Sequence, residues 1–177
     1  LGHSMGGLVT RAACEHGRLK KQRWVRLLNN VVFLGTPLLG APLERAGNWL
    51  DMLLGMSPYT APFAKLGNIR SAGVKDLRHG AAGEDATHAH VALPRAVRWF
   101  AVAASKQEKP EGARKRLQSD GLVPVNSALG RHKDPALGFA IPKSHEAIFF
   151  ETDHFDLLSS ADVYRQLRDW LGGGKVK

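Results

Sequence analysis

The chain has 177 residues, of which 44% are hydrophobic and 23% charged, and this composition is typical of a folded globular protein. No apolar run approaches the roughly 18 residues of a membrane-spanning helix. The formal net charge of +9 raises the question of nucleic acid, but the basic residues are not interleaved with aromatics and form no zinc-finger or RNA-binding signature. We therefore expect no nucleic-acid partner.

The positive charge is concentrated at two places, residues 18–23 and 114–116. The simplest interpretation is a set of solvated helix ends and loops, and weak association with an anionic membrane surface is the alternative. The single cysteine, Cys14, excludes an internal disulfide and reads as a small buried hydrophobic residue. No defined protein partner follows from these features.

The hydrophobic pattern predicts helices and strands in alternation, which implies an α/β fold with a parallel sheet covered by helices on both faces. Strands are predicted at residues 31–34, 98–104 and 147–150, helices at residues 5–16, 43–54, 69–77 and 161–171, and surface connections at residues 80–96 and 105–119. Gly17 is expected to end the first helix, and the turn Gly35-Thr36-Pro37 to close the first of these strands.

Residues 2 to 6 read Gly2-His3-Ser4-Met5-Gly6, the Gly-x-Ser-x-Gly pattern of a nucleophile elbow. In this strand-to-helix turn the serine is held in a strained conformation with its hydroxyl exposed. Gly2 and Gly6 are expected to be glycine because a Cβ would collide where strand and helix approach each other.

An elbow needs a buried strand before it, and only Leu1 precedes Gly2. We therefore expect residues 1–177 to be a single, incomplete domain, the C-terminal portion of a larger α/β fold whose N-terminal strands are absent. Without those strands an apolar sheet edge would be unpaired. We accordingly expect the chain by itself to be prone to aggregation and nearly inactive, whereas the full-length enzyme is expected to be competent.

Serine becomes an effective nucleophile when a histidine takes its proton and an acid orients that histidine. In this fold the three groups follow strands in the order Ser, acid, His. Asp120 follows the strand at residues 98–104, at a turn where Gly121 permits a left-handed conformation, and His154 follows the strand at residues 147–150. Ser4, Asp120 and His154 thus occur in the required order.

Other acids and histidines fit this chemistry less well. Asp153 and Asp156 neighbour His154 in sequence, whereas the geometry requires the acid to come from a different strand. His3 is expected to point away from the nucleophile. His88-Ala89-His90 lacks carboxylate or cysteine partners at metal-ligand spacing, so neither a metal nor an organic cofactor is expected. The histidines expected to be solvated are His16, His79, His88, His90, His132 and His145.

The chain resembles the C-terminal part of an α/β-hydrolase of the lipase/esterase type, and is similar to bacterial lipases of the GPI inositol-deacylase-like group. The resemblance spans residues 1–158, nearly the whole chain. The elbow and the Ser, Asp, His order are specific to the superfamily, whereas the other segments point to its lipase-like members. The segments that carry it are Gly2 to Val9, Leu34-Gly35-Thr36-Pro37, Asp120-Gly121-Leu122-Val123-Pro124 and Asp153 to Leu158.

The resemblance implies that Ser4 is the nucleophile, His154 the general base and then acid, and Asp120 the orienting acid. The backbone N–H of Met5 would supply one oxyanion-hole donor. Two departures stand out. Relatives often have histidine after Gly-Thr-Pro, where this chain has Leu38-Leu39, and the loop that carries the second oxyanion donor is missing.

Residues 38–96 are expected to form a helical cap-like insertion, because more than sixty residues separate two successive predicted strands. The segment 38–66 is notably apolar, which favours a lipid-like or other small ester as the substrate. The resulting prediction is a serine-dependent carboxylic-ester hydrolase working through an acyl-enzyme. A thioesterase or an amidase with the same triad, and a non-catalytic binding module derived from a hydrolase, remain as alternatives.

Overall fold

A computed structural model describes residues 1–39, 96–109, 118–134 and 137–172. The predicted helices at residues 43–54 and 69–77 and the predicted connection at residues 80–95 lie outside these ranges, as does nearly all of the predicted insertion. The secondary-structure elements in chain order are β1 (Gly2–His3), α1 (Met5–Leu19), η1 (Arg23–Leu27), β2 (Asn30–Leu34), β3 (Arg98–Ser105), α5 (Val125–Ala128), η4 (Lys143–His145), β4 (Glu146–Phe150), η5 (Asp156–Leu158) and α6 (Ala161–Leu171).

The strands form one four-stranded sheet in the order β1-β2-β3-β4, and every neighbouring pair is parallel. The parallel α/β fold predicted from the sequence is therefore confirmed. In the register Gly2 pairs with Phe33, Val31 with Trp99, and Val102 with Ala147. Because all strands point the same way, the loops after their carboxyl ends gather along one edge of the sheet.

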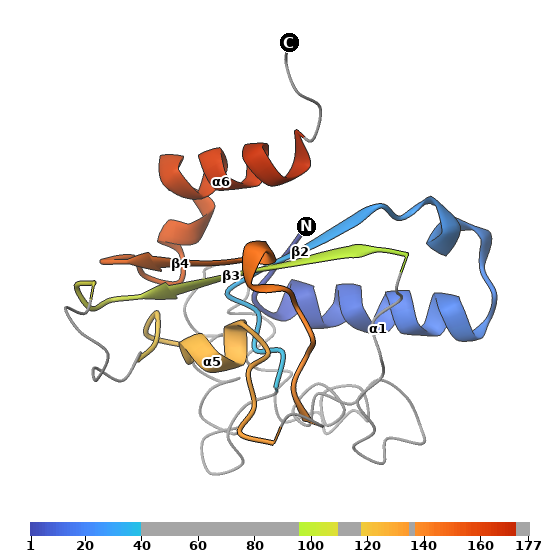
Figure 1. Ribbon diagram of the computed structural model, residues 1–177, viewed down its shortest axis with the longest axis horizontal. Coiled ribbons are helices and arrows are strands. Elements are labelled where there is room, and N and C mark those ends of the chain that lie inside the picture. The colour runs from blue at the N-terminus through green and yellow to red at the C-terminus, as the bar shows by residue number, and fades with distance from the viewer. Residues whose placement is uncertain (40–95, 110–117, 135–136, 173–177) are drawn as a thin grey trace, which may run out of the picture.

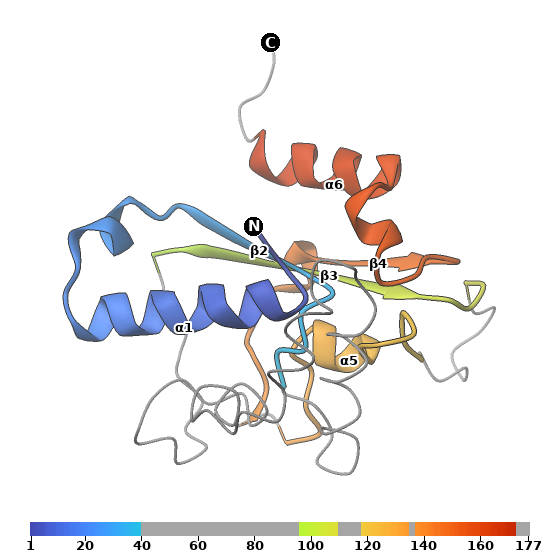
Figure 2. The same ribbon diagram turned by 180° about the vertical axis from the view of Figure 1, so that it is seen from behind.

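Both faces of β2 and β3 are buried, which explains why these strands are continuous apolar runs, whereas β4 is half-buried. Figures 1 and 2 show α1 and α5 on one face and α6 on the other. Side chains alternate between the two cores. Val31, Phe33, Trp99, Ala101 and Ala103 face α1 and α5, whereas Val32, Leu34, Phe100, Val102 and Ala104 face α6.

Helix α1 continues three residues beyond its predicted end, so the prediction that Gly17 ends it is wrong. Gly17 is buried inside the helix. A Cβ there would lie 2.6 Å from both Trp24 Cζ2 and Val25 Cγ2, so the glycine allows η1 to pack directly on the helix. The helix instead ends in the polar stretch Lys20-Lys21, where Lys21 has a φ of 51°.

Helix α6 begins as predicted, because the hydroxyl of Ser160 accepts a hydrogen bond from the N–H of Val163. Val163 is buried in the second core, with Leu167 and Trp170 packed beside it. Trp170 stacks on Phe100 with ring centroids 4.9 Å apart. Leu171, the last residue of α6, is 42% exposed.

The sequence suggested that His145 is solvated, but this residue is half-buried. Its ring packs on Phe100 at 4.3 Å between centroids, and its Nδ1 lies 3.1 Å from the carbonyl oxygen of Trp99. The short η4 turn before β4 brings it there. His16 and His132 are exposed, as expected.

Among the described residues no helix is both long and apolar enough to cross a bilayer.

Candidate active site

Ser4 occupies the turn between β1 and α1 and has φ 51° and ψ −126°. Its N–H donates to the carbonyl of Leu34 at 2.8 Å, and its own carbonyl accepts from the N–H of Gly7 at 3.0 Å. A positive φ at a residue other than glycine is a strained conformation that persists only when surrounding structure enforces it. The strained serine turn predicted from the sequence is therefore present at the carboxyl end of β1, but the hydroxyl of Ser4, which was expected to be exposed, is buried.

Two glycines near this turn, Gly2 and Gly7, have no room for a Cβ, and the sequence prediction named only the first of them. A Cβ on Gly2 would lie 2.7 Å from the Cα of Gly7, as expected of a tight strand-to-helix turn. A Cβ on Gly6, however, would meet no atom within 4 Å. The requirement falls on Gly7, whose Cβ would lie 2.0 Å from Oγ1 of Thr36. The expectation for Gly6 was thus wrong, because this residue faces outward and its neighbour faces the sheet.

Asp120 lies in a tight turn beyond β3 and is only 2% exposed. Its Oδ1 accepts hydrogen bonds from the N–H groups of Leu122 at 2.9 Å and Val123 at 2.7 Å. Gly121 has a φ of 101°, the left-handed conformation predicted for it. The turn therefore holds one carboxylate oxygen and leaves Oδ2 free to face another group.

That other group is His154, which is 1% exposed in the loop after β4. Its Nδ1 lies 2.7 Å from Oδ2 of Asp120, and its backbone N–H donates to the carbonyl of Asp120 at 3.1 Å. An ionised carboxylate only accepts, so Nδ1 carries the proton and Nε2 presents a lone pair. Two residues 34 positions apart are thus joined by side chain and by main chain.

The remaining polar atoms of the site are buried and unpaired. Among the described residues, neither Oγ of Ser4 nor Nε2 of His154 has a hydrogen-bond partner. The structure therefore brings Asp120 and His154 into direct contact, while Ser4 is not hydrogen-bonded to either of them. Unsatisfied buried polar atoms are uncommon in folded proteins and point to a function such as catalysis.

The sequence suggested that His3 points away from the nucleophile, but the His3 side chain lies against His154. Its Nε2 lies 3.0 Å from the carbonyl oxygen of His154, and the two imidazole rings are 4.6 Å apart between centroids. Burial lowers the pKa of His3, and the positive field of a protonated His154 would lower it further. Phe155 packs edge-on against the His154 ring at 5.5 Å.

Asp153 and Asp156 hold the loop around His154 and make no contact with its ring nitrogens. Oδ1 of Asp153 accepts from the N–H groups of Phe155 and Asp156, while Oδ2 of Asp156 accepts from the N–H of Asp153. These reciprocal bonds between side chains and backbone close the turn that leads into η5. The hydrogen bond from the N–H of Asp156 is the main cause of the lowered pKa of Asp153.

Gly35 is part of the site although sequence reasoning assigned it only to a turn. It has a φ of 52°, and a Cβ there would lie 3.1 Å from both Nδ1 and Cε1 of His154. Its N–H donates to the carbonyl of Val102 at 2.8 Å, which fixes it at the carboxyl end of β2. The Gly-Thr-Pro turn predicts a glycine at this position, but only the tertiary structure shows that the ring of His154 lies against it.

Met5 begins α1 directly after Ser4, so its N–H belongs to the first turn, where a helix leaves N–H groups without an intrahelical acceptor. Cys14 is buried in the first core, as expected, and burial raises the pKa of its thiol. In the described part of the chain, no three His, Cys, Asp or Glu side chains are grouped as metal ligands would be.

Comparison with known families adds one finding. A family model described as "PGAP1-like alpha/beta domain" matches residues 1–105, which is more than half of the chain. The matched segment contains Ser4, Met5 and Gly35 but ends before Asp120 and His154. It supports the resemblance to α/β-hydrolases of the lipase/esterase group on independent grounds. No curated protein and no solved structure shows significant similarity to the chain.

Proposed function

The chain belongs to the PGAP1-like alpha/beta domain family, a family of hydrolase type, and on this premise we propose that it hydrolyses carboxylic esters through a serine nucleophile. One observation carries the proposal. A strained Ser4 precedes α1, and the adjacent His3 contacts a buried His154 whose Nδ1 is 2.7 Å from a buried Asp120 and whose Nε2 is unpaired among the described residues.

The first half of the reaction uses each group in one role. His154 accepts the Ser4 proton at Nε2 while Oγ attacks the ester carbonyl carbon. Asp120 keeps the Nδ1–H tautomer in place and stabilises the imidazolium that forms. Charge then develops on the carbonyl oxygen, where the N–H of Met5 donates a hydrogen bond. Removing one such donor typically reduces kcat by about 10²–10³.

The second half regenerates the serine. The imidazolium of His154 returns its proton to the departing alkoxide, and the acyl group stays on Ser4 as an ester. His154 then takes a proton from a water molecule as the water oxygen attacks the acyl carbon. The imidazolium gives this proton to Oγ of Ser4 as the bond between Oγ and the acyl carbon breaks, and a carboxylic acid is released. No redox or metal-dependent step is needed for this sequence.

We propose a lipid-like ester as the substrate. The support is the apolar character of the segment 38–66 and the replacement of a histidine by Leu38-Leu39 after Gly-Thr-Pro. Leu38 is buried among the first core residues, directly after the turn that carries Gly35. A thioester or an amide would use the same three groups, so substrate profiling separates these alternatives.

The test is covalent labelling with a fluorophosphonate, read by intact mass on the wild-type protein, Ser4→Ala and His154→Ala. We expect one adduct on the full-length wild-type protein, located at Ser4 by peptide mapping, and none on either variant of it. His16→Ala is the matched control, because His16 is an exposed histidine on α1 and its loss should leave labelling unchanged.

A protein that unfolds cooperatively but is not labelled would contradict the proposal and favour a non-catalytic binding module. Turnover confined to thioesters or amides would replace the substrate class and keep the mechanism. Turnover of acetate esters alone would contradict the lipid-like substrate. Hydrolysis that rises with acyl-chain length is the result we expect.

We also propose weak association with anionic lipid surfaces. The support is a basic surface at the end of α1 and in η1, where the described structure exposes every charged side chain from residue 18 to residue 26 and none is acidic. Trp24 and Leu27 add exposed apolar area, and such a mixture suits the interface of an anionic bilayer. The residues of this basic surface are Arg18, Lys20, Lys21, Arg23 and Arg26.

A further inference from the structure

We propose that His3 is a positioning residue that ties the nucleophile turn to the loop of the catalytic base and sets the approach of His154 to Ser4. The inference rests on the proposed function. It goes beyond it in assigning a role to the residue next to the nucleophile, for which neither the Ser, Asp, His order nor the family match provides one.

The position of His3 and its contacts with His154 support this role. His3 is the last residue of β1, so its backbone is fixed by the sheet, with His3 paired to Leu34. Its side chain reaches the other loop in two ways. Nε2 lies 3.0 Å from the carbonyl oxygen of His154, and its ring packs on the imidazole of His154 at 4.6 Å with a 42° tilt.

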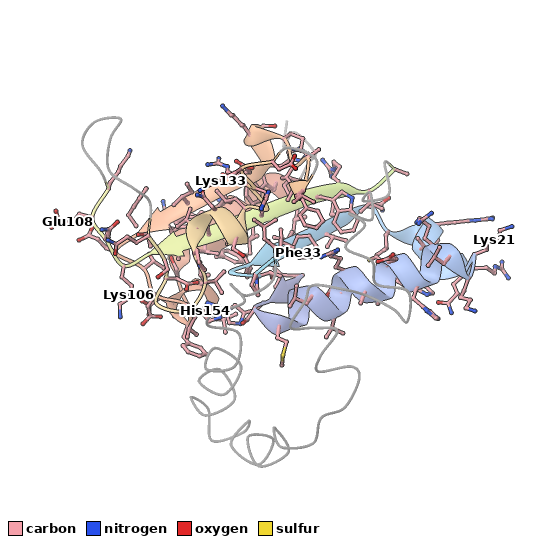
Figure 3. All side chains as sticks on the ribbon, turned by 90° about the horizontal axis from the view of Figure 1, so that it is seen from below. Lys21, Phe33, Lys106, Glu108, Lys133 and His154 are labelled. Atoms are coloured by element: carbon pink, nitrogen blue, oxygen red, sulfur yellow. The ribbon has the colours of Figure 1, made fainter. Side chains whose placement is uncertain are left out.

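The contacts of His3 connect His154 to strand β1, which the other restraints on His154 do not do. Asp120 holds Nδ1 and the backbone N–H of His154, and Gly35 lies beneath the ring. Both restraints come from the Asp120 turn and the end of β2, and neither connects His154 to the strand that carries the nucleophile. His3 does so, because only one peptide bond separates it from Ser4. In Figure 3, His154 is labelled close to the start of α1.

The chemistry assigns a definite proton to His3. A carbonyl oxygen can only accept, so Nε2 of His3 must carry a hydrogen, and in a neutral ring Nδ1 is then the unprotonated nitrogen. Burial lowers the pKa of His3 and so favours the neutral ring, and this effect outweighs the hydrogen bond to the carbonyl of His154, which raises the pKa. A neutral ring is required here, because a charged one at this distance would oppose formation of the His154 imidazolium during the reaction.

Two variants separate the hydrogen bond from simple packing. His3→Gln keeps an N–H donor near the position of Nε2 but removes the ring, whereas His3→Phe keeps a ring and removes the donor. His16→Gln and His16→Phe make the same changes at an exposed histidine of α1 and serve as matched controls. The measurements are the rate of fluorophosphonate labelling, kcat and KM on a p-nitrophenyl ester, the unfolding midpoint, and histidine side-chain ¹⁵N NMR.

We expect His3→Phe to lower the labelling rate and kcat by about tenfold, the size of one lost hydrogen bond in the transition state, with little change in KM. His3→Gln should recover most of this loss. The NMR spectrum of the wild type should show His3 as the Nε2–H tautomer, and His3→Phe should shift the ring nitrogens of His154. Both His16 variants should match the wild type in every measurement.

Three results would overturn the inference. The first is an Nδ1–H tautomer for His3, and the second is wild-type labelling and an unmoved His154 spectrum in His3→Phe. The third is an equal loss in His3→Gln and His3→Phe that follows a lowered unfolding midpoint, which would mark a packing role alone. If the wild type is folded but not labelled, the proposed function fails, and the shift of the His154 nitrogens still decides the positioning role.

Discussion

Gly7 and Thr36 interlock, because a Cβ on Gly7 would lie 2.0 Å from Oγ1 of a threonine that is fully buried. Thr36 also donates through Oγ1 to the carbonyl of Gly2 at 3.4 Å. The first turn of α1 therefore sits directly on the turn that ends β2. This contact places the N-terminus of α1, and with it Ser4 and Met5, against the sheet.

Gly7→Ala is expected to destabilise the protein by about 1–3 kcal/mol, the usual range for overpacking a tight contact. Gly6→Ala is the matched control, since no atom lies within 4 Å of its Cβ position and alanine favours helix over glycine by roughly 1 kcal/mol. Denaturant unfolding of both variants measures the difference. Equal stability of the two would contradict the interlocked geometry.

Gly35→Ala should reduce both stability and fluorophosphonate labelling. The new Cβ would require a strained φ and would press on the ring of His154 at 3.1 Å. A displacement of about 1 Å at a catalytic group can lower a rate by about 10². Gly130→Ala is the control, because Gly130 also has a positive φ, 65°, but its Cβ would meet Phe139 instead. It should lose stability and keep its labelling rate per folded molecule.

Asp120→Asn is expected to lower the labelling rate by about 10³–10⁴ with little change in fold. An asparagine still accepts from the N–H of Leu122 and Val123, but its amide can present a donor to Nδ1 and favour the wrong tautomer of His154. Asp162→Asn, on the exposed start of α6, should behave as wild type. A labelling rate within about tenfold of wild type for Asp120→Asn would place the orienting acid elsewhere.

Asp153 is expected to stabilise the His154 loop in a pH-dependent manner. Its pKa is lowered from 3.8 in the folded protein, so its contribution is complete above that value and is lost as the pH falls through the lowered pKa. Asp153→Ala should cost on the order of 1 kcal/mol near neutral pH, because the N–H groups of Phe155 and Asp156 lose their acceptor, and less in acid. Unfolding measured across the acid range tests this. A cost that is constant with pH would contradict it, and Asp169→Asn provides the control.

The triple variant Lys20→Gln, Lys21→Gln and Arg23→Gln should weaken binding to phosphatidylserine vesicles by about 100-fold, at roughly 1 kcal/mol for each basic residue. Lys109→Gln with Lys133→Gln and Lys143→Gln removes the same charge from other exposed positions and should have a smaller effect. Figure 3 shows Lys21 and His154 at opposite ends of α1, so labelling should not change in either variant. Binding to zwitterionic vesicles alone, or equal losses in both triple variants, would refute a dedicated lipid surface.

Much of this architecture is readable in the chain itself. The β-strands at residues 31–34, 98–104 and 147–150 were predicted to within one residue at each end, because buried parallel strands are short apolar runs bounded by turn residues. The turn at Ser4 and the left-handed Gly121 follow from local glycine patterns. Elements that depend on their surroundings were missed. α5 is four residues long and has no period to detect, and Gly17 resembles a helix end although it is a packing contact.

The sequence by itself determined the α/β class, the position of the strained serine and the order in which serine, acid and histidine follow their strands. These properties depend on local sterics and on the period of apolar residues, and both follow from residues that are close together in the sequence. Only the tertiary structure decided that Oδ2 of Asp120 meets Nδ1 of His154, that Gly7 and not Gly6 must lack a Cβ, and that His3 reaches the His154 loop. Each of these joins loops or strands distant in sequence, and such contacts are fixed by how the sheet brings its strand ends together.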